Sequence, residues 1–412
     1  MFFFRIFAPK IYNNYSTMKI AKIILLVAAM ATASLSALGN DGTYYTRGNQ
    51  LVPLQETDIS VRKEVLTISL MDNGYARVDV QYEFWNPSKE VRRVTMGFEA
   101  DPPYNVDYKL YPDGVHPNIN HFTVEMNGRR LAYRNAVCVA DTLPLTKIED
   151  MKRYYLWDNN FLYDTTNVHP DRDSFEPLNY DDGIRFAYVY YFDADFRPGL
   201  NRVHHTYVYR MSVIVGIPFS VDYKLTPAAR WAGGMIDDFT LIIRADSTAK
   251  HFVVRDGAFG DTPFAVSEGM GKTRHSTHFG SPCTEVSLRN GAIMLHKTAF
   301  RPTAELHIEA VGIDGMTGYA DNAFRVGGSY ERSSSVSLWR PYEGQTVVPA
   351  DKAFRQRVVH NLPYADRGHV FRDRRLREYF ESLWWYMPDP AYKDDTGDFT
   401  PVDWKCVNYK ED

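Results

Sequence analysis

The chain has 412 residues, of which 44% are hydrophobic and 24% are charged, the balance of an ordinary globular protein with room for two or three domains. Its formal net charge of -4 excludes the strong overall basic field of many nucleic-acid-binding proteins. Three cysteines allow at most one disulfide, so the chain is not a disulfide scaffold. Without a CxxC pair, a cysteine-based zinc site is not indicated.

The N-terminal region has the pattern of a secretory signal peptide. A positive start at residues 18–22 precedes an apolar run at residues 23–33, and small residues at Ala37 and Gly39 indicate a cleavage site after Gly39. The apolar run is short for a membrane span, so we expect an exported protein, periplasmic or extracellular, with no membrane span after cleavage. An uncleaved anchor is the alternative. Because this signal is complete from Met18 onward, we expect Met18 to be the true start.

Strand-turn-strand patterns recur from about residue 57 to residue 312. In the segment from Tyr75 to Trp85, every second residue is apolar, which is typical of a strand with one buried face. Asn73-Gly74, Asn127-Gly128 and Asn290-Gly291 each suit a two-residue hairpin turn, because both central residues of that turn need a positive φ. Many short strands with glycine-centred turns favour β-sandwiches over a parallel α/β sheet.

Two parts of the chain depart from the strand pattern. Residues 154–162 suggest a short helix between two sandwiches. After Asp351 the apolar residues follow a helical period, as at Phe354 and Val358, although Pro363 is expected to break a helix there. We therefore place a domain boundary near residue 345.

The segment from residue 360 to residue 388 resembles the signature of the YARHG domain. That signature is an Asn, then Tyr-Ala-Arg-His-Gly, Phe, Leu with Tyr-Phe, Trp-Tyr and Pro; it is matched by Asn361, Tyr364, Ala365, Gly368, Phe371, Leu376, Tyr379, Phe380, Trp385, Tyr386 and Pro388. Asp366 and Arg367 stand where the family has its Arg-His pair. The resemblance implies a small extracellular module of the kind appended to peptidases and other exported domains.

A second, looser resemblance concerns the body of the chain. Residues 40–42, the strand pair from Glu56 to Trp85 and the corner at residues 86–91 are similar to the opening of an uncharacterised family of exported, β-rich bacterial proteins. Residues 223–241 fit its later portion. This resemblance implies the fold and export, and no activity.

The predicted fold class is mainly β, with one or two β-sandwich domains followed by a small helical C-terminal YARHG-like domain. The expected segments are an upstream extension plus signal peptide at 1–39, a β-sandwich at 40–150, a second β-rich domain and linker at 151–345, and the YARHG-like domain at 346–412.

The sequence offers no established catalytic motif. A GxSxG elbow, a Walker loop, HExxH and a dinucleotide fingerprint are all missing, and we expect no cofactor and no metal site. His204 and His205 are neighbours on a predicted strand, so their side chains should point to opposite faces and cannot share one metal. His275 and His278 have HxxH spacing, in what we expect to be a polar loop.

The tail supplies the candidate binding residues, which are aromatic or cationic side chains and the family glycine: Tyr364, Arg367, Gly368, His369, Arg374, Arg375, Trp384 and Trp385. Arginines make bidentate contacts with carboxylates, so these residues could form a patch for acidic envelope polymers or a protein partner. The alternative is a solvated helix face with internal ion pairs, such as Arg374 with Glu378, around an aromatic core.

Two hypotheses about function follow from these features. The first is a non-catalytic exported protein whose β-sandwiches and tail bind a cell-envelope polymer or an exported protein partner, with no nucleic acid involved. The alternative is a hydrolase of unrecognised type with a site between the β domains, motivated by the available acids and histidines and by the occurrence of YARHG domains beside peptidases.

Overall fold

The computed structural model of the protein describes residues 48–54, 57–71, 74–101, 115–139, 152–157, 161–164, 186–214, 217–245, 250–278, 280–310, 351–399 and 401–410. The predicted signal peptide and its cleavage site lie outside these residues. No helix among the described residues is both long and apolar enough to cross a membrane. We call the described strands between residues 48 and 310 the β body and residues 351–410 the tail; both belong to one compact unit, Thr43–Asp412.

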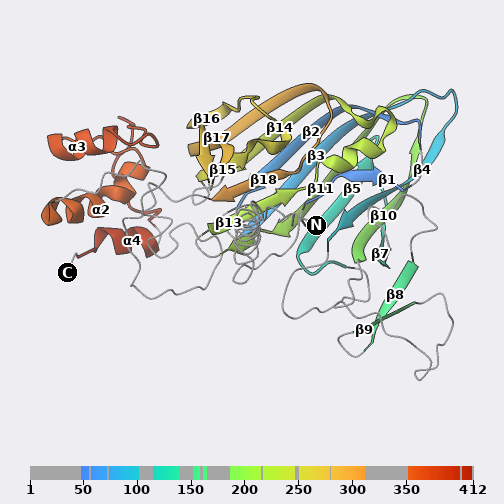
Figure 1. Cartoon of the computed structure of the whole chain (residues 1–412), viewed down its shortest axis with the longest axis horizontal. Helices are drawn as coiled ribbons and strands as arrows, with labels where there is room; N and C mark the ends of the chain where they lie inside the picture. The colour runs from blue at the N-terminus through green and yellow to red at the C-terminus, as the bar shows by residue number, and fades with distance from the viewer. Residues whose placement is uncertain are drawn as a thin grey trace, which may run out of the picture. The chain divides into compact units, whose positions relative to one another are not determined.

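A hairpin of two long strands is central to the larger sheet of the β body. β2 (Ser60–Leu70) pairs antiparallel with β3 (Tyr75–Asn86). The even-numbered residues of β3 are buried and the odd-numbered ones are half-buried or exposed, as the alternating sequence predicted. β2 also pairs in parallel with β14 (Ile236–Ala245), and β3 pairs antiparallel with β11 (Gly199–Arg210). Figure 1 shows these strands running side by side.

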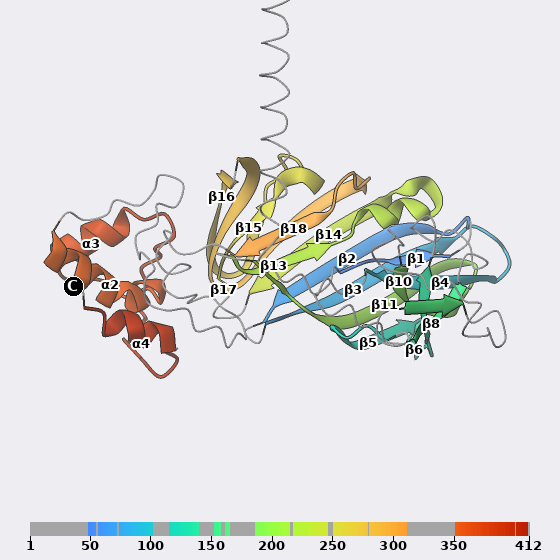
Figure 2. The ribbon, with the colours of Figure 1, turned by 60° about the horizontal axis from the view of Figure 1, so that its bottom comes forward.

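Within the described residues, the larger sheet has twelve strands (Figure 2). In spatial order they are β12 (Ser212–Ile214), β13 (Ile217–Tyr223), β18 (Leu306–Ala310), β15 (His251–Arg255), β17 (Ser281–Phe300), β14, β2, β3, β11, β5 (Ile119–Met126) and β6 (Arg129–Arg130), with β16 (Ala265–His278) paired to β17. Short 3-10 helices form η3 (Thr226–Arg230), η4 (Ala232–Gly234) and η5 (Asp256–Ala258).

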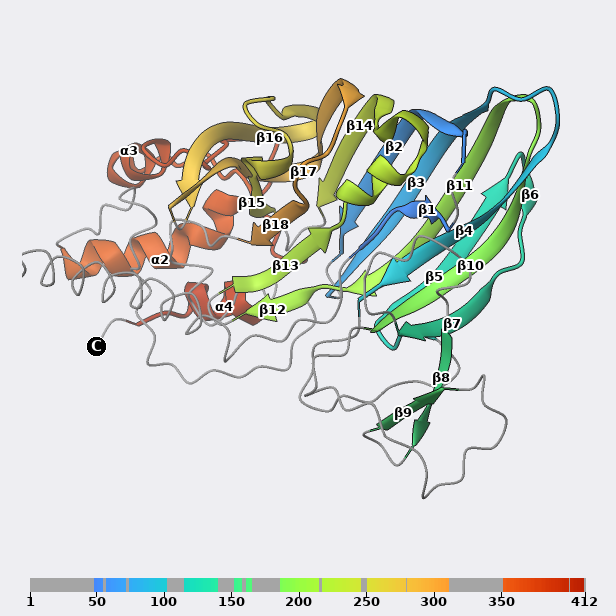
Figure 3. The same cartoon turned by 45° about the vertical axis from the view of Figure 1, so that its right-hand side comes forward.

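A second sheet covers the apolar face of the first. Six strands form it within the described residues: β1 (Leu51–Pro53), β4 (Arg92–Ala100), β10 (Phe186–Phe196), β7 (Arg134–Val139), β8 (Lys152–Trp157) and β9 (Phe161–Asp164). Figure 3 shows β4, β10 and β7 side by side. The ring of Phe98 in β4 lies 4.7 Å from that of Tyr207 in β11, and Phe84 in β3 lies 5.5 Å from Phe196 in β10. One continuous core therefore fills the space between the two sheets.

The sheets do not divide at residue 150, where the sequence suggested a boundary between two β domains. β10 and β11, from the later segment, pair with β4 and β3 from the earlier one. Residues 154–157 and 161–162, for which a helix was expected, belong instead to the antiparallel pair of β8 and β9. Both differences have one cause: a sheet is assembled from non-local backbone hydrogen bonds, which a local residue pattern does not encode.

Asn73 lies outside the described residues, and the other two Asn-Gly pairs have different structural roles. Asn127 and Gly128 both have positive φ, 52° and 77°, and join β5 to β6, which confirms the predicted hairpin. Asn290-Gly291 does not form a hairpin: it lies inside β17, opposite the irregular stretch of β16 around Gly269, and Gly291 has a φ of 98°. The same need for positive φ therefore produces a bulged long strand rather than a turn.

The core also encloses the titratable side chains of Glu64 on β2 and His205 on β11, two strands of the larger sheet that flank β3. Glu64 is 1% exposed and accepts hydrogen bonds from Nε2 of Gln50 at 2.9 and 3.2 Å. Burial raises the pKa of Glu64 to about 8, against the opposing effect of that hydrogen bond. Burial lowers the pKa of His205 to about 3, so this imidazole is neutral in the folded protein at pH 7.

The tail is helical, as predicted. α2 (Lys352–Asp366) begins at Asp351, whose carboxylate accepts hydrogen bonds from the backbone N–H groups of its first turn. α3 (Arg374–Glu381) has the same kind of cap at Asp373, and α4 (Pro401–Val407) packs on α2. Pro363 does not end α2, which continues to Asp366, so the expected break is wrong. Pro363 is buried between Leu362 and Ala365 of the tail's core, and packing of this helix face outweighs the lost backbone hydrogen bond.

Candidate functional site

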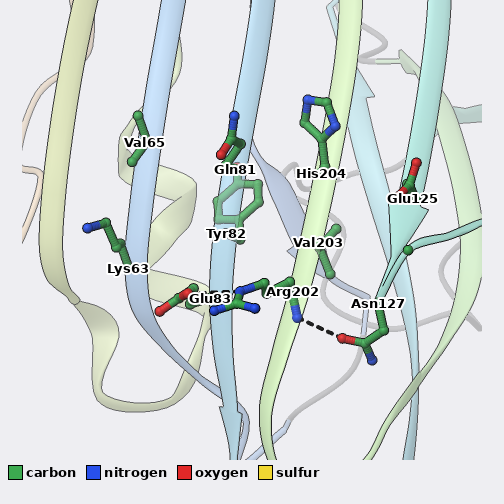
Figure 4. A pocket seen from close by; sticks show the side chains of 11 residues that line it. Lys63, Val65, Gln81, Tyr82, Glu83, Glu125, Asn127, Arg202, Val203 and His204 are labelled. Atoms are coloured by element: carbon green, nitrogen blue, oxygen red, sulfur yellow. Dashed lines mark hydrogen bonds and ion pairs between the residues drawn. The ribbon is translucent and has the colours of Figure 1, made fainter.

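A groove with a cavity of about 380 Å³ lies on the open face of the larger sheet, across β2, β3, β11 and β5. Figure 4 shows its lining side chains: Lys63, Val65, Gln81, Tyr82, Glu83, Glu125, Asn127, Gly128, Arg202, Val203 and His204. Most are the outward-facing residues of their strands, while Tyr82 and Val203 are buried beneath them. The groove therefore follows directly from strand alternation on a sheet with one covered face.

Strand register arranges the outward residues into two parallel rows. In the first row, Val65 pairs with Gln81, Gln81 with His204, and His204 with Glu125. This row places an amide, an imidazole and a carboxylate on adjacent strands, at the spacing of directly opposed cross-strand residues.

The second row runs beside the first, one step along the strands. Lys63 pairs with Glu83 and Glu83 with Arg202, whose backbone N–H donates to Oδ1 of Asn127 at 2.9 Å. A register shift in β2 between Val61 and Lys63 turns the lysine to this face. Together the two rows present ammonium, guanidinium, carboxylate and amide groups on one patch of sheet.

The charges in the groove are only partly paired with one another. Arg202 Nε lies 3.1 Å from Glu83 Oε1, and His204 Nε2 lies 3.0 Å from Oδ1 of Asp79 on the same face. In contrast, the exposed side chains of Lys63, Gln81 and Glu125 make no hydrogen bond or ion pair with the described part of the chain. These three groups can donate to and accept from a ligand without first breaking an internal contact.

An exposed apolar pair continues the same face beyond the second row. Trp85 and Leu200 are directly opposed on β3 and β11 and are 39% and 47% exposed. The guanidinium carbon of Arg62 lies 5.8 Å from the centroid of the Trp85 ring. A flat aromatic surface therefore lies next to a field of hydrogen-bonding groups, a combination suited to a ligand with both polar and apolar faces.

The positions of the histidines determine whether they could bind a metal ion together. His204 is exposed and His205 is fully buried, so the two rings face opposite sides of the sheet, as the sequence predicted. The stretch around His275, expected to be a loop, is part of strand β16. Among the described residues, no group of three or more His, Cys, Asp or Glu side chains is placed to hold a metal ion.

A separate charged cluster lies on β13, β18 and β15. His307 Nδ1 is 2.6 Å from Oδ1 of Asp222, and its Nε2 is 2.5 Å from Oε1 of Glu309. Arg255 lies 2.7 Å from the other oxygen of Glu309. Burial alone would lower the pKa of His307, but hydrogen bonds to the two carboxylates raise it to about 9. This imidazole is therefore charged at neutral pH and bridges two strands.

Several tail residues predicted to bind a partner make internal contacts. Arg367 lies 3.0 Å from Asp398 and 2.8 Å from Asp403, with its guanidinium carbon 4.4 Å from the centroid of the Phe399 ring. Tyr364 packs against the same phenylalanine, with 5.1 Å between ring centroids. Arg367 is thus 11% exposed and holds α2 to the chain before and inside α4.

The other predicted cations of the tail are also paired. Arg374 lies 2.6 Å from Glu378, one helical turn away, the pair that the sequence suggested. Arg375 lies 2.8 Å from Asp351, and its guanidinium carbon lies 3.9 Å from the centroid of the Phe354 ring. His369 pairs with Asp394 through Nδ1.

The last three predicted residues lie against the β body. Gly368 has a φ of 91°. A Cβ added at this position would lie 2.3 Å from Nη2 of Arg289 in β17. The guanidinium carbon of Arg274 in β16 lies 4.1 Å from the centroid of the Trp384 ring. Trp385 is buried, 3% exposed. From the sequence, His204 and Asn127-Gly128 were considered for other roles and no binding site was predicted at the groove residues, although the outward positions of the β3 alternation were a signal for them.

Comparison with known proteins agrees with both resemblances. Residues 354–401 match the YARHG domain, as the sequence predicted. Residues 39–146 match a domain of unknown function, DUF4424, in keeping with the resemblance to an uncharacterised family. Each match covers less than half of the chain. No curated protein matches the sequence significantly.

Solved structures resemble the chain only distantly. A candidate nutrient-binding protein from Legionella pneumophila is 16% identical, with a TM-score of 0.47 over 90% of this chain and 99% of that chain. An M1 zinc metallopeptidase from Deinococcus radiodurans is 12% identical, with a TM-score of 0.24 over 75% of this chain and 54% of that one. Baculovirus P35 is 11% identical, with a TM-score of 0.25 over 64% of this chain and 99% of that one. All three TM-scores are below 0.5, so these likenesses carry no argument about fold or function.

Proposed function

We propose that the protein is a non-catalytic exported binding protein whose groove on the open sheet face takes a hydroxyl-rich polymer of the cell envelope. The observation that carries the proposal is the pair of cross-strand rows, in which Lys63, Gln81 and Glu125 are exposed on the same sheet face as Trp85. Sugar hydroxyls both donate and accept hydrogen bonds, so they match a surface that mixes ammonium, amide and carboxylate groups. The apolar face of a sugar ring fits an exposed tryptophan.

The form of the groove supports binding of an extended chain rather than a small enclosed ligand. The groove is open along the sheet, and the exposed Trp85–Leu200 pair lies beyond its second row. A polymer can cross several strands at once and gain one or two hydrogen bonds at each, with a small net contribution from each bond. The hydrolase alternative stays an untested prediction, since no single feature of the described residues favours it.

The test measures binding of the protein from residue 40 onward to isolated peptidoglycan and to outer-envelope glycans, by co-sedimentation and titration. We expect the triple variant Lys63→Ala, Gln81→Ala, Glu125→Ala to bind on the order of thirtyfold more weakly, from three lost hydrogen-bonding groups at about 0.7 kcal/mol each. Trp85→Ala should weaken binding separately. Lys89→Ala, which removes an exposed lysine outside the groove, is the matched control and should bind like the wild type.

Two results would count against the proposal. If the full chain binds none of these polymers, the envelope-polymer function is wrong. If the chain binds but the triple variant and Trp85→Ala bind as tightly as the wild type, the groove is not the binding site.

A further inference from the structure

We propose that Asp366 is the specificity-determining residue that docks the YARHG domain on its own β body. The body contributes a surface of five cationic or titratable side chains from β15, β16, β17 and the residue before β15, which we call the basic surface: Lys250, His251, Lys272, Arg274 and Arg289. The partner that this surface fits is a YARHG domain with an acidic residue at the first of the two namesake positions. A domain with arginine there would be rejected.

The central contact is a buried ion pair across the two parts of the chain. Oδ2 of Asp366 lies 3.1 Å from Nζ of Lys250, and Oδ1 lies 3.0 Å from Nε2 of His251. The three side chains are 14%, 8% and 5% exposed, so little water is available to replace a missing partner. Burial alone would raise the pKa of Asp366, but Lys250 and His251 hold it well below its usual range. The carboxylate is therefore ionised in the docked state.

A second ion pair lies beside the family glycine. Arg289 Nη1 lies 3.0 Å from Oδ2 of Asp389, and the Arg289 side chain is 11% exposed. The backbone N–H of Asp389 donates to the carbonyl oxygen of Gly368 at 2.8 Å, which brings the two tail segments together at this arginine. A Cβ at Gly368 would lie 2.3 Å from the guanidinium, so Arg289 would have to move, and the positive φ favours glycine at this position.

In the remaining contacts, the body again supplies the cation and the tail supplies its partner. Lys272 Nζ donates to the carbonyl oxygens of Trp384 at 3.1 Å and Tyr386 at 2.8 Å. Arg274 stacks on the face of Trp384. At these contacts the body supplies the positive partners, and the tail supplies carboxylates, carbonyl oxygens and an aromatic face. Charge complementarity of this kind selects one partner and disfavours others.

The family name itself records arginine at the position of Asp366. An arginine there would place a second permanent positive charge beside Lys250 and remove the hydrogen-bond partner of His251, in a contact that is mostly closed to water. The exchange of arginine for aspartate is therefore what allows this domain to dock on this body, and the tail is a fixed part of the molecule rather than a free module.

The experiment uses the full chain with a specific protease site inserted near residue 330, cut after folding. Size-exclusion chromatography then measures whether the tail stays with the body, and far-UV circular dichroism checks that both pieces remain folded. The nicked wild type should elute as one species. Asp366→Arg and, separately, Lys250→Glu should release the tail, with docking weakened on the order of a hundredfold or more.

The double variant Asp366→Arg, Lys250→Glu restores opposite charges and should recover at least tenfold of the lost docking. Glu381→Arg, which makes the same kind of change at an exposed position of the tail, is the control and should stay docked. Separation of the nicked wild type would overturn the proposal, and so would retention of the Asp366→Arg tail. If both single variants release the tail but the double variant recovers nothing, Asp366 does not act through Lys250 and the proposal is wrong.

Discussion

Replacing Glu64 by glutamine should change how the stability of the protein depends on pH. This carboxyl lies in the core between the two sheets, is 1% exposed, and has the amide of Gln50 as a hydrogen-bond donor. Burial raises its pKa in the folded protein to about 8, from an ordinary value of 4.5. Glu64→Gln keeps the size and hydrogen-bonding capacity of the side chain but removes its titration.

The sign of the effect follows from proton linkage. Between pH 4.5 and pH 8, the folded protein keeps a proton on Glu64 that the unfolded chain has lost. The free energy of unfolding of the wild type therefore falls with rising pH by about 1.4 kcal/mol per pH unit in this window, from this group alone. The stabilisation is fully present below pH 4.5 and is lost as the pH rises to 8, a change of at most about 5 kcal/mol.

The assay is chemical unfolding of the wild type and Glu64→Gln at pH 5, 6, 7 and 8, followed by tryptophan fluorescence. We expect the variant to gain stability relative to the wild type as the pH rises, and to be the more stable protein at pH 8. Glu125→Gln, at an exposed position on the same sheet, should show no such trend. A difference in unfolding free energy between Glu64→Gln and the wild type that is the same at pH 5 and pH 8 would refute the reasoning.

Two further predictions concern β17 and the charged cluster on β18. Gly291→Ala should destabilise the protein by at least about 3 kcal/mol, because the new Cβ would lie 2.0 Å from the carbonyl oxygen of Glu268 and φ is positive. Gly128→Ala, with positive φ but no atom near the new Cβ, should cost only about 1–2 kcal/mol, and equal losses in thermal unfolding would contradict the steric argument. His307→Gln should cost more stability at pH 6 than at pH 9.5, because the raised pKa of His307 gives a contribution that is complete below pH 6.5 and lost as the pH rises through 9. A loss independent of pH in urea unfolding would show that the bridging charge does not stabilise the fold.

The local sequence pattern predicted the structure correctly where a single strand or turn determines it. The alternation along residues 75–86 identified the buried face of β3, and the positive φ required at Asn127-Gly128 identified a true hairpin. At Asn290-Gly291 the same local requirement was met inside a long strand, because the pairing of β17 with β16 and β14 lies outside the local sequence. The effect of Pro363 was misjudged for a related reason: it is buried in a helix whose neighbouring residues Leu362 and Ala365 pack in the core of the tail.

Neither site could be located from the sequence, since each brings together side chains from distant segments. The groove needs the register of β3 with β2 and of β11 with β3 and β5, which places Lys63 beside Glu83 and His204 beside Glu125. The sequence alone indicated a mainly β chain with a YARHG-like end, and it showed that Asp366 departs from the family pattern, because these properties depend on residue order. Only the tertiary structure explained that departure, since Lys250 and His251 are 116 and 115 positions away from Asp366 along the chain and meet it only in the folded protein.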